Sequence, residues 1–314
     1  MRYLIGSLIL FLVACHLLWP LAPLRLDSEL SLILLVELRL PRTLIVVGYG
    51  AALGISGAAL QALFANPLAS PDISGASGGA ALGAVIGGYW LGFSQPLALA
   101  ACGAAGAGFA MILLLVLAGR RADSATLLLA GLAISLAAGA ATSFALALAP
   151  SPFAFYDAFD WLMGSVVDRS PGQATAALVP ATIACVFLLR RAHVLDLFAL
   201  GEDVAASLGH RPRRLAQEIV GLSAVAVGAF VAVAGAIGFV GLVAPVVARR
   251  LTRGHPGRAM VPAGAIGAIL LVMADLAVRA IPLDRTLPLG VLTALFGTPV
   301  FLYLIIKMRR SVKS

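Results

Sequence analysis

Long apolar segments recur along the whole chain, separated by short polar stretches. Their approximate bounds are 3–24, 43–64, 74–92, 95–118, 125–149, 171–190, 214–236, 239–252, 260–281 and 287–307. About twenty apolar residues form a helix of about 30 Å, which matches the hydrocarbon thickness of a bilayer. The pattern therefore predicts an all-α polytopic membrane protein with about ten transmembrane helices.

The composition supports this class and leaves no room for a separate soluble domain. Of the 314 residues, 61% are hydrophobic and 11% are charged, whereas an ordinary soluble domain is about 25% charged. We predict a single transmembrane domain over residues 1–314. A signal peptide is the alternative interpretation of segment 3–24, but the segment is too long for a typical apolar region and lacks a small-residue cleavage motif near its end.

The distribution of positive charge orients the predicted helices. The predicted topology places 16 of the 22 lysines and arginines on one side of the membrane and 6 on the other. The six are Arg25, Arg39, Arg42, Arg169, Arg279 and Arg285. Because the positive side of a membrane protein faces the cytoplasm, both termini are expected to be cytoplasmic. The net charge of +8 then reflects topology, and we predict no nucleic-acid partner.

Signals for resident chemistry are weak. Cys15, Cys102 and Cys185 each lie alone in an apolar segment, and the histidines are scattered, so no metal site is predicted. A Walker loop needs G-x-x-x-x-G-K-[ST], but the two lysines, Lys307 and Lys313, both lie in the C-terminal tail. We therefore expect a chain that is not an enzyme, carries no cofactor and depends on another polypeptide for any ATP hydrolysis.

An ordered set of short motifs carries a family resemblance. They are Arg39-Leu-Pro-Arg42, Gly57-Ala-Ala-Leu-Gln61, Asn66-Pro-Leu-Ala69, Gly75-Ala-Ser-Gly78, Leu128-Leu-Ala-Gly131, Trp161-Leu-Met-Gly-Ser165, Ala206-Ser-Leu-Gly209, Gly238-Phe-Val-Gly-Leu242, Ala274-Asp275, Leu287-Pro-Leu-Gly290 and Phe296-Gly-Thr-Pro299. In this order the chain resembles the permease subunits of ABC importers for iron chelates, haem and cobalamin, the FecCD/BtuC-like type II importers.

The resemblance implies a complete transport complex in the bacterial inner membrane. It implies a homodimer of this chain, two ATP-binding cassette subunits that hold ATP and Mg, and one periplasmic substrate-binding protein. The implied cargo is a metal chelate, with an iron–siderophore as the first expectation and cobalamin or haem next.

Arginines on the less basic side are candidates for partner docking. Arg39 and Arg42 lie three residues apart and so share one helix face, and Arg279 ends the ninth apolar segment on the same side. The resemblance implies that these three arginines meet acidic groups of the binding protein; anchoring to lipid headgroups is the alternative. Asp275 precedes Arg279 by four residues, which predicts a structural ion pair, with a proton relay as the alternative.

The stretch 192–214 is predicted to be a cytoplasmic coupling segment. It mixes polar and apolar residues and divides at Gly201 and Gly209 into two short helices. The resemblance implies that it seats in a groove of the ATPase subunit. The implied contact residues are Glu202, Asp203, Val204, Ala205, Ala206, Ser207, Leu208 and Gly209. A solvated loop is the alternative, but it would expose apolar side chains such as Leu208 to water.

A cytoplasmic gate is expected where two apolar segments meet the cytoplasm. The resemblance implies gate residues Asn66, Leu68, Ser124 and Ala125. Asn66 and Pro67 also suit simple helix termination, and both roles are compatible. The polar residues expected along the path itself are few, namely Gln61, Thr142 and Ser143.

Two other function classes compete with this interpretation. An ion-coupled secondary transporter of a small solute would need intramembrane acids or a sodium site in unwound helices, for which Asp275 offers the one candidate acid. A membrane enzyme would need paired catalytic acids, a histidine cluster or a serine–base pair, and the sequence contains no such pattern.

Overall fold

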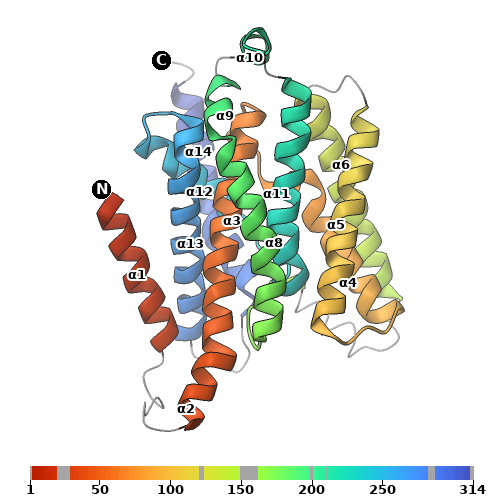
Figure 1. Ribbon diagram of the computed structural model, residues 1–314, viewed down its shortest axis with the longest axis vertical. Helices are drawn as coiled ribbons and strands as arrows, with labels where there is room; N and C mark the ends of the chain where they lie inside the picture. Colours follow the sequence, from red (N-terminus) through yellow and green to blue (C-terminus); the bar gives the residue numbers. More distant parts are fainter. Residues whose placement is uncertain are drawn as a thin grey trace.

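The computed structural model describes residues 2–19, 29–119, 124–148, 162–198, 201–209, 211–281 and 287–311 as one bundle of helices (Figure 1). Strands are absent from these residues. The α-helices are α1 (Arg2–Leu18), α2 (Glu29–Leu34), α3 (Leu40–Leu63), α4 (Ala76–Val85), α5 (Pro96–Ala118), α6 (Ser124–Ala147), α8 (Pro171–Arg190), α9 (Ala192–Phe198), α10 (Glu202–Ser207), α11 (Pro212–Ala234), α12 (Val240–Leu251), α13 (Pro256–Ala280) and α14 (Leu289–Ser311). The all-helical class predicted from the sequence is confirmed for this part of the chain.

Six helical stretches among the described residues are long and apolar enough to cross a membrane, judged by length and composition. They are Leu32–Leu63, Leu97–Leu117, Thr126–Ala147, Pro171–Arg190, Pro212–Ala234 and Pro256–Ala280. The apolar stretches Gly6–Leu18 and Leu289–Val300 belong to α1 and α14, whose remaining side chains lie outside the described residues. Helix α4 continues through the π-helical residues Ile86–Trp90, and α12 has 12 residues; both fall below the length of a full span, so the predicted count of ten stays a prediction.

Helix α3 forms the centre of the bundle. It packs against α8, α11, α12 and α13. In the most apolar 18-residue stretch of the helix, 78% is buried, whereas in the corresponding stretch of α5 at the edge of the bundle 22% is buried. Figure 1 shows α9 and α10 at one end of the bundle and α2 at the opposite end. Because α3 runs between these ends, it places residues near its start and residues after its end at opposite faces of the protein.

Helices α3 and α13 approach each other through glycines. A Cβ atom added to Gly54 would collide with the carbonyl oxygen of Ala263, and one added to Gly267 would collide with that of Gly50. Small residues permit such close backbone contact, which is a main source of packing energy between helices in lipid. The two helices therefore have no space between them for larger side chains.

The start of α3 differs from the sequence-based expectation. The apolar pattern predicted a helix beginning close to Thr43, but the helix continues back through a π-helical turn, Leu35–Arg39, into α2. Pro41 lacks an N–H group and its ring crowds the carbonyl four residues earlier. The wider π-helical turn absorbs this mismatch, so the helix continues instead of ending at the proline.

Irregular backbone between α11 and α12 is stabilised inside the bundle. Tyr49, which is fully buried, donates from its hydroxyl to the carbonyl of Gly235 at 3.0 Å and accepts from the N–H of Ile237 at 3.3 Å. Its ring stacks on Phe230 with ring centroids 5.0 Å apart. Non-helical backbone at membrane depth requires such internal partners, and Tyr49 supplies them.

Candidate functional site

A buried ion cluster lies where α1, α3 and α13 meet, near the α2 end of the bundle. Asp275 of α13 is 1% exposed and lies at its centre. Arg42 of α3 donates to both of its oxygens, from Nη2 to Oδ1 at 2.8 Å and from Nε to Oδ2 at 3.1 Å. Arg279, one helical turn further along α13, donates from Nε to Oδ2 at 2.9 Å. Two guanidinium groups thus share one carboxylate.

His16 of α1 joins this cluster and is fully buried. Its Nε2 lies 2.8 Å from Oδ2 of Asp275, and its Nδ1 lies 2.8 Å from Oγ1 of Thr43. The hydroxyl of Thr43 donates to the backbone carbonyl of Arg39 at 2.8 Å, and it has one proton to give. Nη2 of Arg279 lies 3.0 Å from the same Nε2 of His16, so His16 is in contact with Thr43, Asp275 and Arg279 at once.

Arg279 of the cluster and the neighbouring Arg39 cap the C-terminal end of α1. Nη1 of Arg279 lies 3.0 Å from the carbonyl oxygen of His16 and 3.2 Å from that of Trp19. Nη1 of Arg39 lies 3.2 Å from the carbonyl oxygen of Leu18. The last carbonyls of a helix lack intrahelical partners and carry partial negative charge. Guanidinium groups from the π-helical turn before α3 and from α13 satisfy them, so the cluster attaches α1 to the bundle.

The three arginines predicted for docking are thus gathered at one place, and each is bonded. The Arg42 side chain is 18% exposed and that of Arg279 is 12% exposed, so both present only part of their surface to solvent. Three guanidinium groups against the Asp275 carboxylate leave the cluster itself with excess positive charge.

A further arginine, Arg169, precedes α8 and makes a separate contact. Its guanidinium donates to the carbonyl of Ser165 at 3.1 Å. Burial lowers the pKa of Arg169, and the neighbouring Asp168 carboxylate partly offsets this effect. Because its hydrogen bond stays within its own turn, Arg169 is a useful control for the cluster.

The predicted coupling segment forms the two short helices α9 and α10. Helix α9 packs into the bundle through Val194, Leu195 and Phe198. The carboxylate of Asp196 accepts from the backbone N–H of Gly257 at 2.8 Å. This bond satisfies one of the free N–H groups in the first turn of α13. The segment is therefore tied to α13, the helix that carries Asp275 at its other end.

Helix α10 projects from the end of the bundle (Figure 1). Ala205 is fully buried beneath it, whereas Val204 is 39% exposed and Leu208 is 59% exposed. Ala206, Ser207 and Gly209 are also exposed, and the side chains of Glu202 and Asp203 lie outside the described residues. The helix thus presents an apolar and small-residue surface beyond the bundle, with Ala205 as an inward contact.

The candidate gate residues lie near the ends of their helices. After α3, the side-chain oxygen of Asn66 accepts from the N–H of Leu68 at 2.9 Å, which forms a tight turn, and Leu68 is 36% exposed. Helix α6 begins at Ser124, and the side chains of Ser124 and Ala125 lie outside the described residues.

Of the three polar residues expected along the path, two are buried and one is exposed. Gln61 is fully buried, with Nε2 donating to the carbonyl of Leu242 at 3.1 Å. Thr142 is 8% exposed and donates to its own helix at Ala138. Ser143 is exposed, but it too donates to its own helix.

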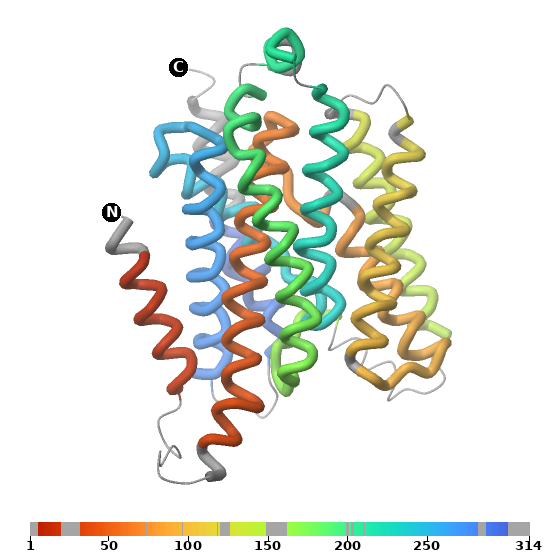
Figure 2. The backbone as a smooth tube through the Cα atoms, viewed as in Figure 1, coloured from red at the N-terminus to blue at the C-terminus, as the bar shows by residue number. Residues whose placement is uncertain are grey.

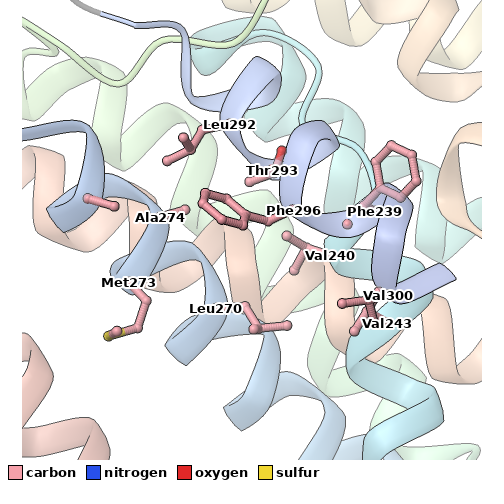
Figure 3. A pocket seen from close by; sticks show the side chains of 12 residues that line it. Phe239, Val240, Val243, Leu270, Met273, Ala274, Leu292, Thr293, Phe296 and Val300 are labelled. Atoms are coloured by element: carbon pink, nitrogen blue, oxygen red, sulfur yellow. The ribbon is translucent and has the colours of Figure 1, made fainter. Parts of the chain in front are cut away.

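An apolar cavity of about 280 Å³ lies between α12, α13 and α14 (Figure 3). Phe239, Met273, Leu292 and Phe296 are among the side chains around it, and the hydroxyl of Thr293 bonds to its own helix. The lining contains no charged side chain, so this cavity offers no counter-ion to a charged cargo. No group of three or more histidine, cysteine, aspartate or glutamate side chains is placed to hold a metal ion in the described ranges.

Sequence reasoning missed His16, Thr43 and Asp196. A histidine in an apolar span is a signal in itself, because polar groups in membrane helices are normally paired. Thr43 lies one helical turn after Arg39, which allows its bond to the Arg39 carbonyl. Asp196 gave no comparable signal, since its partner is a backbone N–H on a distant helix.

A bundle of apolar helices with its ion cluster and irregular backbone packed inside defines a multi-pass membrane protein. The model of the FecCD transport family matches residues 4–307, and the chain belongs to this family. Its curated relatives include the vitamin B12 import system permease protein BtuC of Vibrio cholerae, 38% identical over 95% of this chain and 92% of the relative. The BtuC protein of Citrobacter koseri is 39% identical over 87% and 83%.

Solved structures share the fold. One, described as a metal-chelate type ABC transporter in an inward-facing conformation, superposes with a TM-score of 0.85 at 27% identity and covers 97% of this chain and 98% of the other. PsaBC from Streptococcus pneumoniae in complex with Fab gives a TM-score of 0.55 at 16% identity, covering 83% and 89% of the two chains. This second likeness concerns the fold alone.

Proposed function

We propose that this chain is the transmembrane permease subunit of a binding-protein-dependent ABC importer for a metal chelate in the bacterial inner membrane. One observation carries the proposal. In a member of the FecCD transport family, the arginine cluster and the protruding α10 lie at opposite ends of one bundle. An importer needs two such faces, one for a soluble partner that delivers cargo and one for a motor.

The cluster is proposed as the docking face for a periplasmic substrate-binding protein. Arg39, Arg42 and Arg279 give the cluster excess positive charge, which attracts an acidic partner and fixes its register. Asp275 holds Arg42 and Arg279 at fixed positions, so little side-chain entropy is lost when a partner binds. Anchoring to lipid headgroups is the competing role for the same charges.

Helix α10 is proposed as the seat of the ATP-binding cassette subunits. Val204 and Leu208 are exposed at its surface, and exposed apolar groups of this kind mark protein contacts. Two copies of this chain, two ATPase subunits that carry ATP and Mg, and one binding protein make up the proposed complex. Ten membrane crossings, with both termini on the α10 side, complete the topology.

The gate is proposed at the same end of the bundle. Asn66 and Leu68 follow α3, and Ser124 and Ala125 open α6, so a tilt of these helices would move all four residues. The turn of residues 71–74 is tied to α6 by the hydroxyl of Ser135, which donates to the carbonyl of Asp72 at 2.6 Å. This contact gives α3 and α6 a physical connection through which movement can pass.

Cobalamin is the cargo to test first, because the relatives reported above are named as vitamin B12 import permeases. An iron–siderophore, the first expectation from the sequence, and haem come next. An ion-coupled secondary transporter is the alternative. It would need a carboxylate free to exchange protons or ions, whereas both oxygens of Asp275 accept hydrogen bonds from arginines.

Reconstitution tests the proposal. The chain is placed in liposomes with its ATPase subunit and binding protein, and uptake of cobalamin, a ferric siderophore or haem is measured with and without ATP. We expect uptake of one chelate that requires ATP and both partners. Concentrative uptake by this chain alone, driven by an ion gradient, would establish the alternative.

A charge-reversal variant tests the docking face. Arg39→Glu should abolish capture of the binding protein and leave the ATPase subunit bound. Arg39 is the better target, because reversal at Arg42 would place a second carboxylate against buried Asp275 and disturb folding. Arg169→Glu reverses an arginine outside the cluster and should retain docking; equal loss in both variants would argue for a diffuse charge effect.

A further inference from the structure

A wide groove separates the N-terminal half of α1 from the N-terminal part of α13. Helix α1 lies at the edge of the bundle (Figure 2). The hydrogen bond that joins it to α13 lies near the C-terminal end of both helices. The groove above this attachment has a volume of about 910 Å³. Its lining comes from Gly6 and Ile9 of α1, from Val261, Pro262 and Ala265 of α13, and from Leu251, Thr252, Arg253, His255, Gly257 and Arg258 at its upper end.

The lining divides into an apolar trough and a basic rim. Gly6, Ile9, Val261 and Ala265 form the trough, and Val261 is 63% exposed. Arg253, His255 and Arg258 form the rim, and all three are exposed. Ala265 follows Arg258 by seven residues, which is about 10 Å along a helix. The trough therefore extends from the rim to the depth of lipid acyl chains.

The rim is held in place by its backbone. The N–H of Gly254 donates to the carbonyl of Arg249 at 3.0 Å, and the N–H of Ala259 donates to the carbonyl of His255 at 3.1 Å. These bonds close the turn between α12 and α13, so Arg253 and Arg258 are presented on a fixed loop and on the first turn of α13. A fixed backbone lowers the entropy cost of bringing both guanidinium groups to one anion.

We propose that this groove binds one anionic phospholipid of the surrounding bilayer. The phosphate lies at Arg253 and Arg258, and the acyl chains lie in the trough between α1 and α13. Basic pockets between transmembrane helices on the cytoplasmic side suit anionic headgroups. The proposal concerns a site apart from the docking face and the coupling segment, and it stands whether or not the importer function does.

The shape of the groove favours a lipid over a protein occupant. A subunit docked beneath the membrane could reach Arg253, but its polar surface would not enter an apolar trough at the depth of Ala265. The trough opens beside α1 at the edge of the bundle, where lipid is the ordinary neighbour. An anionic lipid satisfies both halves of the lining, whereas a zwitterionic lipid adds a positive group next to the arginines.

Native mass spectrometry of the purified full chain tests the site. The protein is equilibrated with equal amounts of phosphatidylglycerol and phosphatidylethanolamine, and the ratio of the two retained lipids is measured. Each arginine near an anionic headgroup contributes about a fivefold preference, so Arg253→Gln with Arg258→Gln should lower the ratio by about 25-fold. The matched control, Arg213→Gln with Arg214→Gln, removes two exposed arginines at the start of α11 and should leave the ratio unchanged.

A second variant tests the trough separately from the charges. Gly6 lines the groove, and a Cβ atom added to it meets nothing within 4 Å, so Gly6→Phe adds a ring at the trough and should displace the retained anionic lipid. Gly108→Phe makes the same change at another open position and should retain it. Size-exclusion profiles and unfolding temperatures of all variants confirm folding.

Three results would overturn the proposal. Wild-type protein that retains no excess of phosphatidylglycerol excludes the site. An equal effect of the Arg213 and Arg214 control shows a diffuse charge effect, and an unchanged ratio in Gly6→Phe shows that the groove holds no acyl chain. Weaker capture of an ATPase subunit by the Arg253 and Arg258 variant, with an unchanged lipid ratio, would assign the rim to a protein partner instead.

Discussion

Arg42 and Asp275 are 233 positions apart in the sequence, yet the Arg42 guanidinium grips the Asp275 carboxylate with two hydrogen bonds, of 2.8 and 3.1 Å. This pair joins α3 to α13 at the end of the bundle where docking is proposed. Bidentate charge pairs of this kind fix geometry as well as contributing stability. Asp275 therefore determines the positions of the Arg42 and Arg279 guanidinium groups.

Removal of the central carboxylate should destabilise the protein strongly. We expect Asp275→Asn to lower the free energy of unfolding by about 3–5 kcal/mol, because Arg42 and Arg279 are left as buried charges without their counter-ion. Equilibrium unfolding in mixed micelles measures the change in the free energy of unfolding. Because the residues act as one network, Asp275→Asn with Arg42→Gln should cost less than the sum of the two single changes. Strict additivity would show that Arg42 does not depend on Asp275.

The attachment of α1 should depend on His16. His16→Phe keeps an aromatic ring but removes both nitrogens. We expect it to loosen α1 and so to raise the rate of maleimide labelling at Cys15 about tenfold. The reason is that hydrogen bonds to charged groups contribute about 1.5–3 kcal/mol, and about 1.4 kcal/mol is a factor of ten. The measurement uses protein in which Cys102 and Cys185 are changed to alanine.

A parallel protein that retains Cys102 as its one thiol controls for general loosening of the bundle. Cys102 lies on α5, away from the cluster, and its labelling rate should not change. A similar rise at both thiols would show that the histidine stabilises the whole protein and not the attachment of α1.

Close contact between α3 and α13 should not tolerate a methyl group. We expect Gly54→Ala to destabilise the protein by about 1–3 kcal/mol, because the new Cβ atom would meet the carbonyl oxygen of Ala263 and push the helices apart. Gly6→Ala, at a position with open space, is the control and should be neutral or stabilising by up to about 1 kcal/mol. Thermal unfolding compares the two, and an equal effect would contradict the packing argument.

The bond between Asp196 and Gly257 should matter more for transport than for stability. Loss of a helix cap costs about 1 kcal/mol, so Asp196→Ala should remain folded. If α9 transmits motion to α13, uptake by the reconstituted complex should fall several-fold while ATP hydrolysis continues. Asp196→Asn keeps an acceptor oxygen and should restore most of the uptake. A matched fall in uptake and hydrolysis would point to failed assembly instead.

The helical class and several helix bounds could be predicted because membrane spans are set by local apolar length. The segment 171–190 coincides with α8, for example. The spacing of Asp275 and Arg279 likewise suggested a contact, and the two side chains lie 2.9 Å apart. The docking role of the arginines stays a prediction, as do the coupling and gate assignments.

Long-range partners could not be predicted in the same way. Local spacing says nothing about a partner on another helix, so neither the Arg42–Asp275 pair nor the contact of His16 with Asp275 was foreseen. The extension of α3 through Pro41 was also missed, because a proline ordinarily ends a helix, and a π-helical turn that accommodates it has no clear sequence signature.

The glycine contacts between α3 and α13 have a mechanical consequence. Two helices whose backbones are in such close contact resist separate movement, so α3 and α13 move as one rigid unit. Asp196 accepts a hydrogen bond at one end of this unit, and the other end carries Arg42 and Arg279. Helix α13 has 25 residues and is about 37 Å long, so a tilt of about 5° around its middle shifts each tip by about 1.6 Å, in opposite directions. In the proposed importer, a push received at the α10 end of the bundle would thereby be delivered at the docking face.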